Sequence, residues 1–391
     1  MADYKVPGVH VEEPFGLSLS IQTGATAVPV LAFEADKLGE WSGAIATDKV
    51  TGFESWLEVS AALAKKRPPA EEAGQAFDKA ISKNLLYQSL KLYFLNGGGH
   101  CYVAPVDKLE ALVPALDDVT LLVQAGSLLK KFQDAVSKLC KTGNTYFAIF
   151  DSSNTELTTD SVPTEAKNFG VTSPAFAAVY YPWLTVDGVV NDSTQPAQPV
   201  PIPPSGAVAG VYARVDRERG VWKAPANVEI VGAQPLYKVS DAVDAKCNVP
   251  DKGGKSINVI RAFRGTGPLI WGARTLQSDQ DTWKYVPVRR LFNAVEKDVK
   301  TAMSTALFEP NSAPTWERVR GSVDHYLHGL WRDGALQGDT PAQAYYVQIG
   351  LGTTMTQEDI TNGRMIVKVG LAAVRPAEFI VLQLTQDVVP A

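Results

Sequence analysis

The chain has 391 residues, which is long for a single hydrophobic core and predicts two domains. Its net charge of −5 argues against a broad nucleic-acid-binding face, and no apolar run approaches the ~20 residues that span a bilayer. The first residues, MADYKVPGVHVEE, have neither the basic nor the apolar region of a secretory signal. We therefore expect the protein to fold in the cytoplasm of the cell that makes it.

The amino-terminal residues 3–25 do not have the pattern of a compact domain. Pro7 and Gly8 exclude a helix, and one short alternating run, Val9–Glu12, follows them. A single short strand leaves half of its backbone donors and acceptors without partners. It is therefore either an ordinary edge strand of this chain or a strand donated to a neighbouring molecule.

Residues 26–240 alternate between apolar runs and amphipathic segments, which predicts an α/β domain with parallel strands flanked by helices. Strands are predicted at Ala27–Phe33, Cys101–Val106, Tyr146–Asp151 and Ala175–Leu184, and Val119–Gly126 is predicted to be a strand followed by a turn. Helices are predicted at Phe77–Asn96 and Ser127–Cys140. The proline-rich stretch 187–205 is expected to be a surface loop or linker, and Ala207–Ile230 a passage into the last domain.

Residues 241–391 have the pattern of an α+β domain. Strands are predicted at Ile257–Phe263, Leu269–Ala273, Tyr345–Ile349, Met365–Val369 and Glu378–Leu384. One helix carries an apolar face of Phe292, Val295, Val299, Met303 and Leu307. A second follows Pro314, with an apolar face of Trp316, Val319, Val323, Tyr326 and Leu330. Its polar face carries Arg318, Arg320, Asp324, His325, His328 and Arg332.

No set of residues in the chain has the spacing of a catalytic, metal or cofactor site. The thiols of Cys101, Cys140 and Cys247 are widely separated, which predicts buried, reduced cysteines. The run GGKS that ends at Ser256 fails as a phosphate-binding loop, because Val249 stands where the pattern needs glycine. We therefore predict no cofactor and no enzyme activity.

Several blocks of the sequence, in the order of the family, resemble the contractile tail sheath family of phages, bacteriocins and extracellular injection systems. The amino-terminal blocks are YKVPGVHVEE (Tyr4–Glu13), FLNGGGHCYVAPV (Phe94–Val106) and AVYYPWL (Ala178–Leu184). The others are PPSGAVAGVYARVDRERGVWKAPAN (Pro203–Asn227), RAFRGTGPLIWGARTL (Arg261–Leu276), LWRDGALQG (Leu330–Gly338) and VRPAEFI (Val374–Ile380). Blocks in register along most of the chain are more specific than any one of them.

The resemblance implies a discontinuous α+β core domain, formed by the amino- and carboxyl-terminal parts, with an inserted α/β domain. It divides the chain into an extended arm at 1–25, an inserted domain at 26–240 and a core domain at 241–391. It also implies strand exchange between subunits. The strand residues expected to take part are Tyr4, Val6, Val9, Val11, Phe379, Val381, Leu382 and Leu384.

In function, the resemblance implies a structural subunit that polymerises helically around an inner tube and contracts to drive the tube through a target envelope. Its implied partners are further copies of itself in stacked six-fold rings, the tube protein, and baseplate and terminator proteins, without nucleic acid or membrane insertion. Arg318, Arg320 and Arg332 are candidates to face the tube, although a solvated helix face explains them equally well. Assembly in a bacterial cytoplasm, into a virion or a released tail-like particle, is expected.

One reading from another class stays open. The alternation in residues 26–180 would also suit an α/β enzyme, such as a nucleotide-dependent oxidoreductase or hydrolase. That alternative predicts a closed oligomer with a pocket for a ligand, whereas a sheath subunit predicts open helical polymers. The sequence does not distinguish a phage from a bacteriocin or an injection system.

Overall fold

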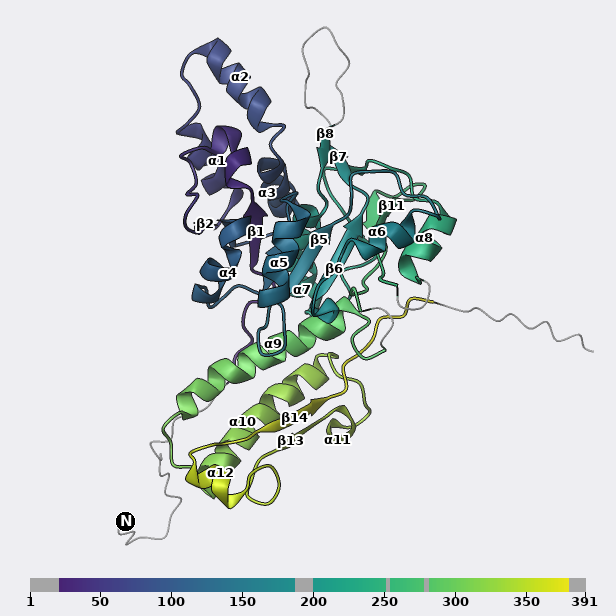
Figure 1. Ribbon diagram of the computed structural model, residues 1–391. Helices are drawn as coiled ribbons and strands as arrows, with labels where there is room; N and C mark the ends of the chain where they lie inside the picture. The colour runs from purple at the N-terminus through teal and green to yellow at the C-terminus, as the bar shows by residue number, and fades with distance from the viewer. Residues whose placement is uncertain (1–20, 187–199, 251–253, 278–280, 380–391) are drawn as a thin grey trace, which may run out of the picture. The chain divides into compact units, whose positions relative to one another are not determined.

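The computed structural model describes residues 21–186, 200–250, 254–277 and 281–379 (Figure 1). The described chain forms two compact units. The larger unit holds residues 23–297, 334–337 and 373–379, and the smaller holds residues 21–22, 298–333 and 338–372. Helices and strands are mixed in both, as the predicted α+β class requires.

A nine-stranded sheet forms the centre of the larger unit in the described residues, with the strand order β2-β3-β1-β4-β5-β6-β11-β12-β9. The strands are β1 (Pro29–Phe33), β2 (Thr51–Phe53), β3 (Cys101–Pro105), β4 (Leu121–Val123), β5 (Phe147–Asp151), β6 (Ala177–Tyr181), β9 (Val228–Glu229), β11 (Asn258–Ala262) and β12 (Pro268–Ile270). From β3 to β11 neighbouring strands are parallel, and β2, β12 and β9 pair antiparallel at the two edges. A small sheet of β10 (Gln234–Pro235), β7 (Leu184–Val186) and β8 (Val200–Ile202) lies in the same unit.

Helices cover both faces of the large sheet, because successive residues of each strand point to opposite sides. Leu31, Val123 and Ile149 pack on one face with α1 (Trp56–Ala64), α2 (Glu71–Ile81), α3 (Leu85–Leu95) and α7 (Ser205–Arg219). Val30, Leu122 and Phe150 pack on the other with α4 (Leu109–Leu112), α5 (Leu129–Leu139), α6 (Val162–Lys167) and α8 (Asp241–Asn248). The predicted α/β organisation is thus confirmed for this sheet.

The smaller unit contains the long helix α10 (Ala313–Arg332) and a two-stranded sheet of β13 (Tyr345–Gln348) and β14 (Lys368–Leu371). Two short helices, α11 (Pro341–Ala344) and α12 (Gln357–Thr361), complete it, and the last turns of α9 (Val286–Met303) belong to it. Short 3-10 turns occur along the chain at Ala35–Lys37, Gly39–Trp41, Val106–Lys108, Val113–Ala115, Pro174–Phe176 and Ser304–Ala306. Within the described residues no helix is long and apolar enough to cross a bilayer.

Several predicted elements differ from the structure in their bounds. The helix predicted over Phe77–Asn96 is two helices, because Asn84 begins α3 by accepting a hydrogen bond from the N–H of Tyr87. The strand predicted over Ala175–Leu184 is divided into β6 and β7 around Pro182. Of the predicted loop 187–205, residues 187–199 lie outside the described part, and Val200–Ile202 forms β8.

The passage predicted at Ala207–Ile230 was the largest error. Residues Ser205–Arg219 form α7, whose first nine residues are all buried in the core of the larger unit. The Cβ positions of Gly206 and Gly210 lie within 3 Å of the backbone of α3, so only glycine allows this close helix contact. The large sheet also continues past residue 240, since β11 pairs with β6.

Candidate intersubunit surfaces

The sheet of the smaller unit has only two strands in the described residues. β13 and β14 pair antiparallel, with Tyr346 opposite Gly370 and Val347 opposite Val369. Each strand pairs only with the other in the described chain, so the main-chain groups along both outer edges have no strand partner there. A two-stranded sheet is marginally stable in water, and an open edge can accept another strand. These edges can therefore receive an added segment.

The helix α10 supports this sheet from within the smaller unit. Its buried side chains include Val319, Val323 and Leu330, as the apolar periodicity predicts. Tyr345 of β13 is also buried, and burial together with the nearby Asp324 carboxylate raises the pKa of its hydroxyl. One side of the small sheet is thus fixed against a helix, while its edges stay open.

The three arginines predicted to face a tube lie on the exposed surface of α10. Arg318, Arg320 and Arg332 are all exposed in the described structure. Each has an acidic neighbour. Arg318 lies 3.6 Å from Glu309, Arg320 contacts Glu317, and Arg332 lies 4.0 Å from Asp333. Exposed pairs of this kind contribute little to stability, so these side chains are available to exchange partners with another molecule.

Most residues predicted to take part in strand exchange lie outside the described chain. These are Tyr4, Val6, Val9, Val11, Val381, Leu382 and Leu384. Phe379, the last described residue, is 70% exposed and lies in no strand. By contrast, the side chain of the preceding residue, Glu378, is largely buried.

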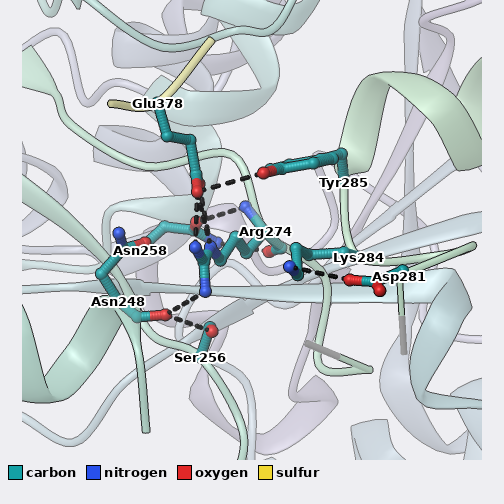
Figure 2. Close-up of polar contacts among 8 residues, drawn as sticks. All are labelled: Asn248, Ser256, Asn258, Arg274, Asp281, Lys284, Tyr285 and Glu378. Carbon is teal, nitrogen blue, oxygen red and sulfur yellow. Dashed lines mark hydrogen bonds and ion pairs between the residues drawn. The ribbon is translucent and has the colours of Figure 1, made fainter. Parts of the chain in front are cut away.

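Glu378 is held tightly by the larger unit (Figure 2). The Nε of Arg274 donates to its Oε1 at 2.8 Å, and the Nη2 of Arg274 donates to its Oε2 at 2.5 Å. The hydroxyl of Tyr285 also donates to Oε2, at 3.2 Å. The two charged side chains are 5% and 14% exposed, so the pair is largely removed from water. Bidentate contacts of this kind fix orientation as well as distance.

The arginine is itself fixed by the backbone around it. Its Nη1 donates to the carbonyl of Asn248, and its own N–H and C=O both bond to the side chain of Asn258 (Figure 2). Burial acts against the charge of Arg274, but its hydrogen bonds to Glu378 and the charge of Glu378 outweigh this, so the pKa of the guanidinium is raised. Burial and the Glu378 carboxylate likewise raise the pKa of Tyr285. This group was not predicted from the sequence, although an arginine inside an apolar block was its signal.

The edge where an α/β enzyme would bind a ligand is occupied by the chain itself. Ligands of such sheets bind outside the carboxyl ends of the strands. There, Asp151 at the end of β5 accepts from the N–H of Gly126 at 3.0 Å, and from the N–H and hydroxyl of Ser205 at 2.7 and 2.9 Å. Its carboxylate takes the donors that an anionic ligand would use. The described structure does not favour the nucleotide-dependent alternative at this position.

The three cysteines are free and buried, as predicted, and burial raises the pKa of each thiol. A thiol with a raised pKa is a poor nucleophile and a poor metal ligand at neutral pH. In the described ranges, no group of three or more His, Cys, Asp or Glu side chains is placed to hold a metal ion. The candidate surfaces are therefore the open sheet, the arginine face of α10 and the region around Glu378.

Comparison with known proteins gives these surfaces a context. Residues 103–276 match the family model of the phage tail sheath protein central domain, and residues 278–387 that of the phage tail sheath C-terminal domain. The structure is also similar to the PVC sheath of an extracellular contractile injection system in its contracted state. The two share 46% sequence identity over 99% of both chains, with a TM-score of 0.83. The chain belongs to the contractile tail sheath family.

Two further similar proteins agree with this assignment. A chain of the contracted anti-feeding prophage baseplate is 40% identical, with 98% of this chain and 99% of that chain covered and a TM-score of 0.81. The tail sheath protein of Vibrio phage KVP40 is 30% identical over 133 residues, which is 33% of this chain but 19% of the phage protein. The match thus covers 98–99% of this chain for the PVC sheath and the baseplate chain, but only 33% of this chain and 19% of the phage protein.

Proposed function

We propose that this chain polymerises helically around an inner tube, and that the polymer contracts to drive the tube through a target envelope. Family membership supports the structural role. The observation that carries the assembly mechanism is the two-stranded β13–β14 sheet with its open edges. The energy for contraction comes from a change of packing between subunits, so no catalytic residue, cofactor or nucleotide is required.

Strand exchange is the proposed link between subunits. The segments around Tyr4–Val11 and Phe379–Leu384 of neighbouring chains would add strands to the open edges of β13 and β14. Main-chain hydrogen bonds would provide the affinity, and alternate side chains would provide the specificity. Such links keep subunits connected while they rotate, because they can reorient without dissociating.

The proposed domain organisation follows from the same exchange. An arm at 1–25 and a core at 241–391 would form one discontinuous domain around an inserted domain at 26–240. The smaller unit contains α10 and the open sheet, which supports a separate core domain within residues 241–391. The continuation of the large sheet through β11 and β12 favours a boundary nearer residue 297 than residue 240.

The proposed partners are further copies of the chain in six-fold stacked rings, an inner tube protein, a baseplate and a terminator. Assembly would take place in a bacterial cytoplasm, without nucleic acid or membrane insertion. Solved relatives occur in the PVC sheath complex and in the anti-feeding prophage baseplate and helical sheath, which supports self-assembly and contact with a baseplate.

Electron microscopy of the intact chain beside a deletion of residues 1–25 tests the assembly proposal. The intact chain, alone or with its tube protein, should form long hollow tubes, and the deletion should give a folded chain that forms none. Tubes of normal length from the deletion would exclude exchange of the amino-terminal arm. Discrete particles from the intact chain, with and without tube protein, would exclude the proposed function itself.

Contact with the tube is tested at α10. Replacement of Arg318 and Arg320 by glutamate should prevent assembly on the tube, because the face would then carry charge of the opposite sign. The matched control replaces the exposed Arg67 and Lys130 of the larger unit by glutamate, which changes the net charge equally. Normal extended particles from the α10 variant would contradict a tube-facing role for these arginines.

A further inference from the structure

We infer that Arg274 and Arg290 are positioning residues, which fix the points where the two exchanged ends of the chain leave the larger unit. Each does so through a buried ion pair with a carboxylate, Arg274 with Glu378 and Arg290 with Asp216, and we call each pair a root. The inference rests on the proposed strand exchange, which it deepens by naming what sets the register of the exchanged strands.

The carboxyl-terminal root is the pair of Arg274 and Glu378 (Figure 2). Three donor groups converge on the Glu378 carboxylate, namely the Nε and Nη2 of Arg274 and the hydroxyl of Tyr285. Phe379, the next residue, is largely exposed. Glu378 is therefore held in place by side-chain hydrogen bonds, and the predicted exchange strand begins at the next residue, Phe379.

The amino-terminal root is the pair of Arg290 and Asp216, whose side chains are 3% and 5% exposed. The guanidinium contacts both carboxylate oxygens, at 2.9 and 2.5 Å. Thr26 is bound by both partners, since its carbonyl accepts from Arg290 at 3.1 Å and its hydroxyl donates to Asp216 at 2.5 Å. The guanidinium also lies 4.6 Å from the ring centre of Tyr212. Thr26 comes directly after the predicted arm at 1–25.

The chemistry of both roots suits positioning better than cohesion. Apolar side chains of the same volume would hold two segments together at least as well, because a buried ion pair loses its hydration. A planar guanidinium that grips a carboxylate through two bonds also fixes direction and distance, which apolar contacts do not. Such a contact is useful where the position of a residue along the chain matters.

Position along the chain does matter for an exchanged strand. A slip of one residue turns every side chain of a strand to the opposite face of the sheet. The number of residues between a root and the neighbour's sheet is constant only if the root is fixed. The two roots therefore set which residues of the arm reach the edge of β13 or β14 in the next subunit.

The first test removes one charge of the carboxyl-terminal root. Glu378→Gln keeps the size of the side chain and leaves Arg274 without its carboxylate. In the intact chain, we expect amide exchange of residues 373–379 to rise at least tenfold, and the fraction that assembles with tube protein to fall at least tenfold. The control is Arg261→Met, which breaks contacts of an arginine with Asp241 and Asp244 in the same unit but touches neither root. The control should assemble normally.

The second test leaves the root intact and changes the spacing after it. Insertion of one serine after Phe379 should prevent assembly, because it inverts the faces of the following strand. Insertion of two serines should restore part of it, because the faces alternate correctly again. These variants keep the test decisive even if Glu378→Gln fails to fold, since neither insertion alters a described contact.

The outcomes separate this inference from the proposed function. If deletion of residues 380–391 abolishes tubes while Glu378→Gln and the one-residue insertion both assemble like the unaltered chain, strand exchange stands and the root inference is overturned. Tubes of normal length from the 380–391 deletion would instead refute exchange of this arm. Loss of assembly in both Glu378→Gln and the one-residue insertion, with a normal Arg261→Met control, would establish the root.

Discussion

The buried carboxyl group of Asp151 predicts an unusual dependence of stability on pH. Burial raises its pKa from 3.8 to about 6, and its hydrogen bonds from Gly126 and Ser205 oppose the rise only in part. The folded state thus binds a proton more tightly than the unfolded state. Its contribution to stability is present below about pH 4 and is lost as the pH rises through about 6.

The magnitude follows from the two pKa values. At about 1.4 kcal/mol for each pH unit, the shift corresponds to about 3 kcal/mol between low and neutral pH. Between pH 4.5 and 7.5 about 2 kcal/mol of this should be measurable. The assay is urea unfolding of the dilute intact chain across this range, beside Asp151→Asn, which cannot titrate.

The variant separates this group from all others that titrate. Asp151→Asn should be less stable at low pH, because an amide nitrogen cannot accept from the N–H of Gly126. The difference in unfolding free energy between the two proteins should then shrink by about 2 kcal/mol from pH 4.5 to 7.5. Parallel pH profiles of the two proteins would refute the assignment, as would a difference that grows with pH.

Two further substitutions test backbone features of the two units. Phe308 is fully exposed and has a φ of 68°, which favours glycine. Phe308→Gly should therefore raise the free energy of unfolding, measured in urea, by about 1 kcal/mol. A fall in the free energy of unfolding would show that the Phe308 side chain makes a stabilising contact in the free chain. Gly210→Ala should lower the free energy of unfolding by at least about 2 kcal/mol, because its Cβ would lie 2.3 Å from the carbonyl oxygen of Tyr93. In the control Gly329→Ala the Cβ meets nothing within 4 Å, so thermal melting should show a stabilisation of up to about 1 kcal/mol. Equal effects of the two alanines would contradict the close contact of α3 and α7.

The elements that the sequence predicts best are those with one buried and one exposed face. In α10, apolar residues such as Val319 and Val323 recur at helical spacing, and the arginines between them are exposed. The strand β5 was predicted equally well, because it is a short run of apolar residues between polar turns. In both cases the apolar positions in the local sequence coincide with the buried positions in the structure.

The helix α7 could not be found in this way. It is buried on all sides near its start, so it lacks the alternation of polar and apolar residues that marks an amphipathic helix. Two of its residues, Gly206 and Gly210, also have weak helix propensity, and their close contact with α3 explains why glycine stands there. A helix of this kind is specified by tertiary packing.

The roots were out of reach for a related reason. Arg274 and Glu378 are 104 residues apart, and Arg290 and Asp216 are 74 apart. The sequence near one partner does not identify the other, because each arginine lies among apolar residues that are typical of a hydrophobic core. Resemblance to a family suggests that both ends of the chain are exchanged, whereas the contacts of Thr26 and Glu378, which lie next to those ends, come from the structure.

The open edges of the β13–β14 sheet can also pair with the wrong segment. Main-chain hydrogen bonds do not depend on side-chain identity, so any extended segment that reaches the edge first can occupy it. Under the proposed strand exchange, ordered growth is a kinetic competition between the correct neighbour and misplaced copies, and the misplaced copies gain with the concentration of free chain. A cell that makes this protein benefits from a small unassembled pool, and purified chain should polymerise most regularly when it is dilute and growing ends are supplied.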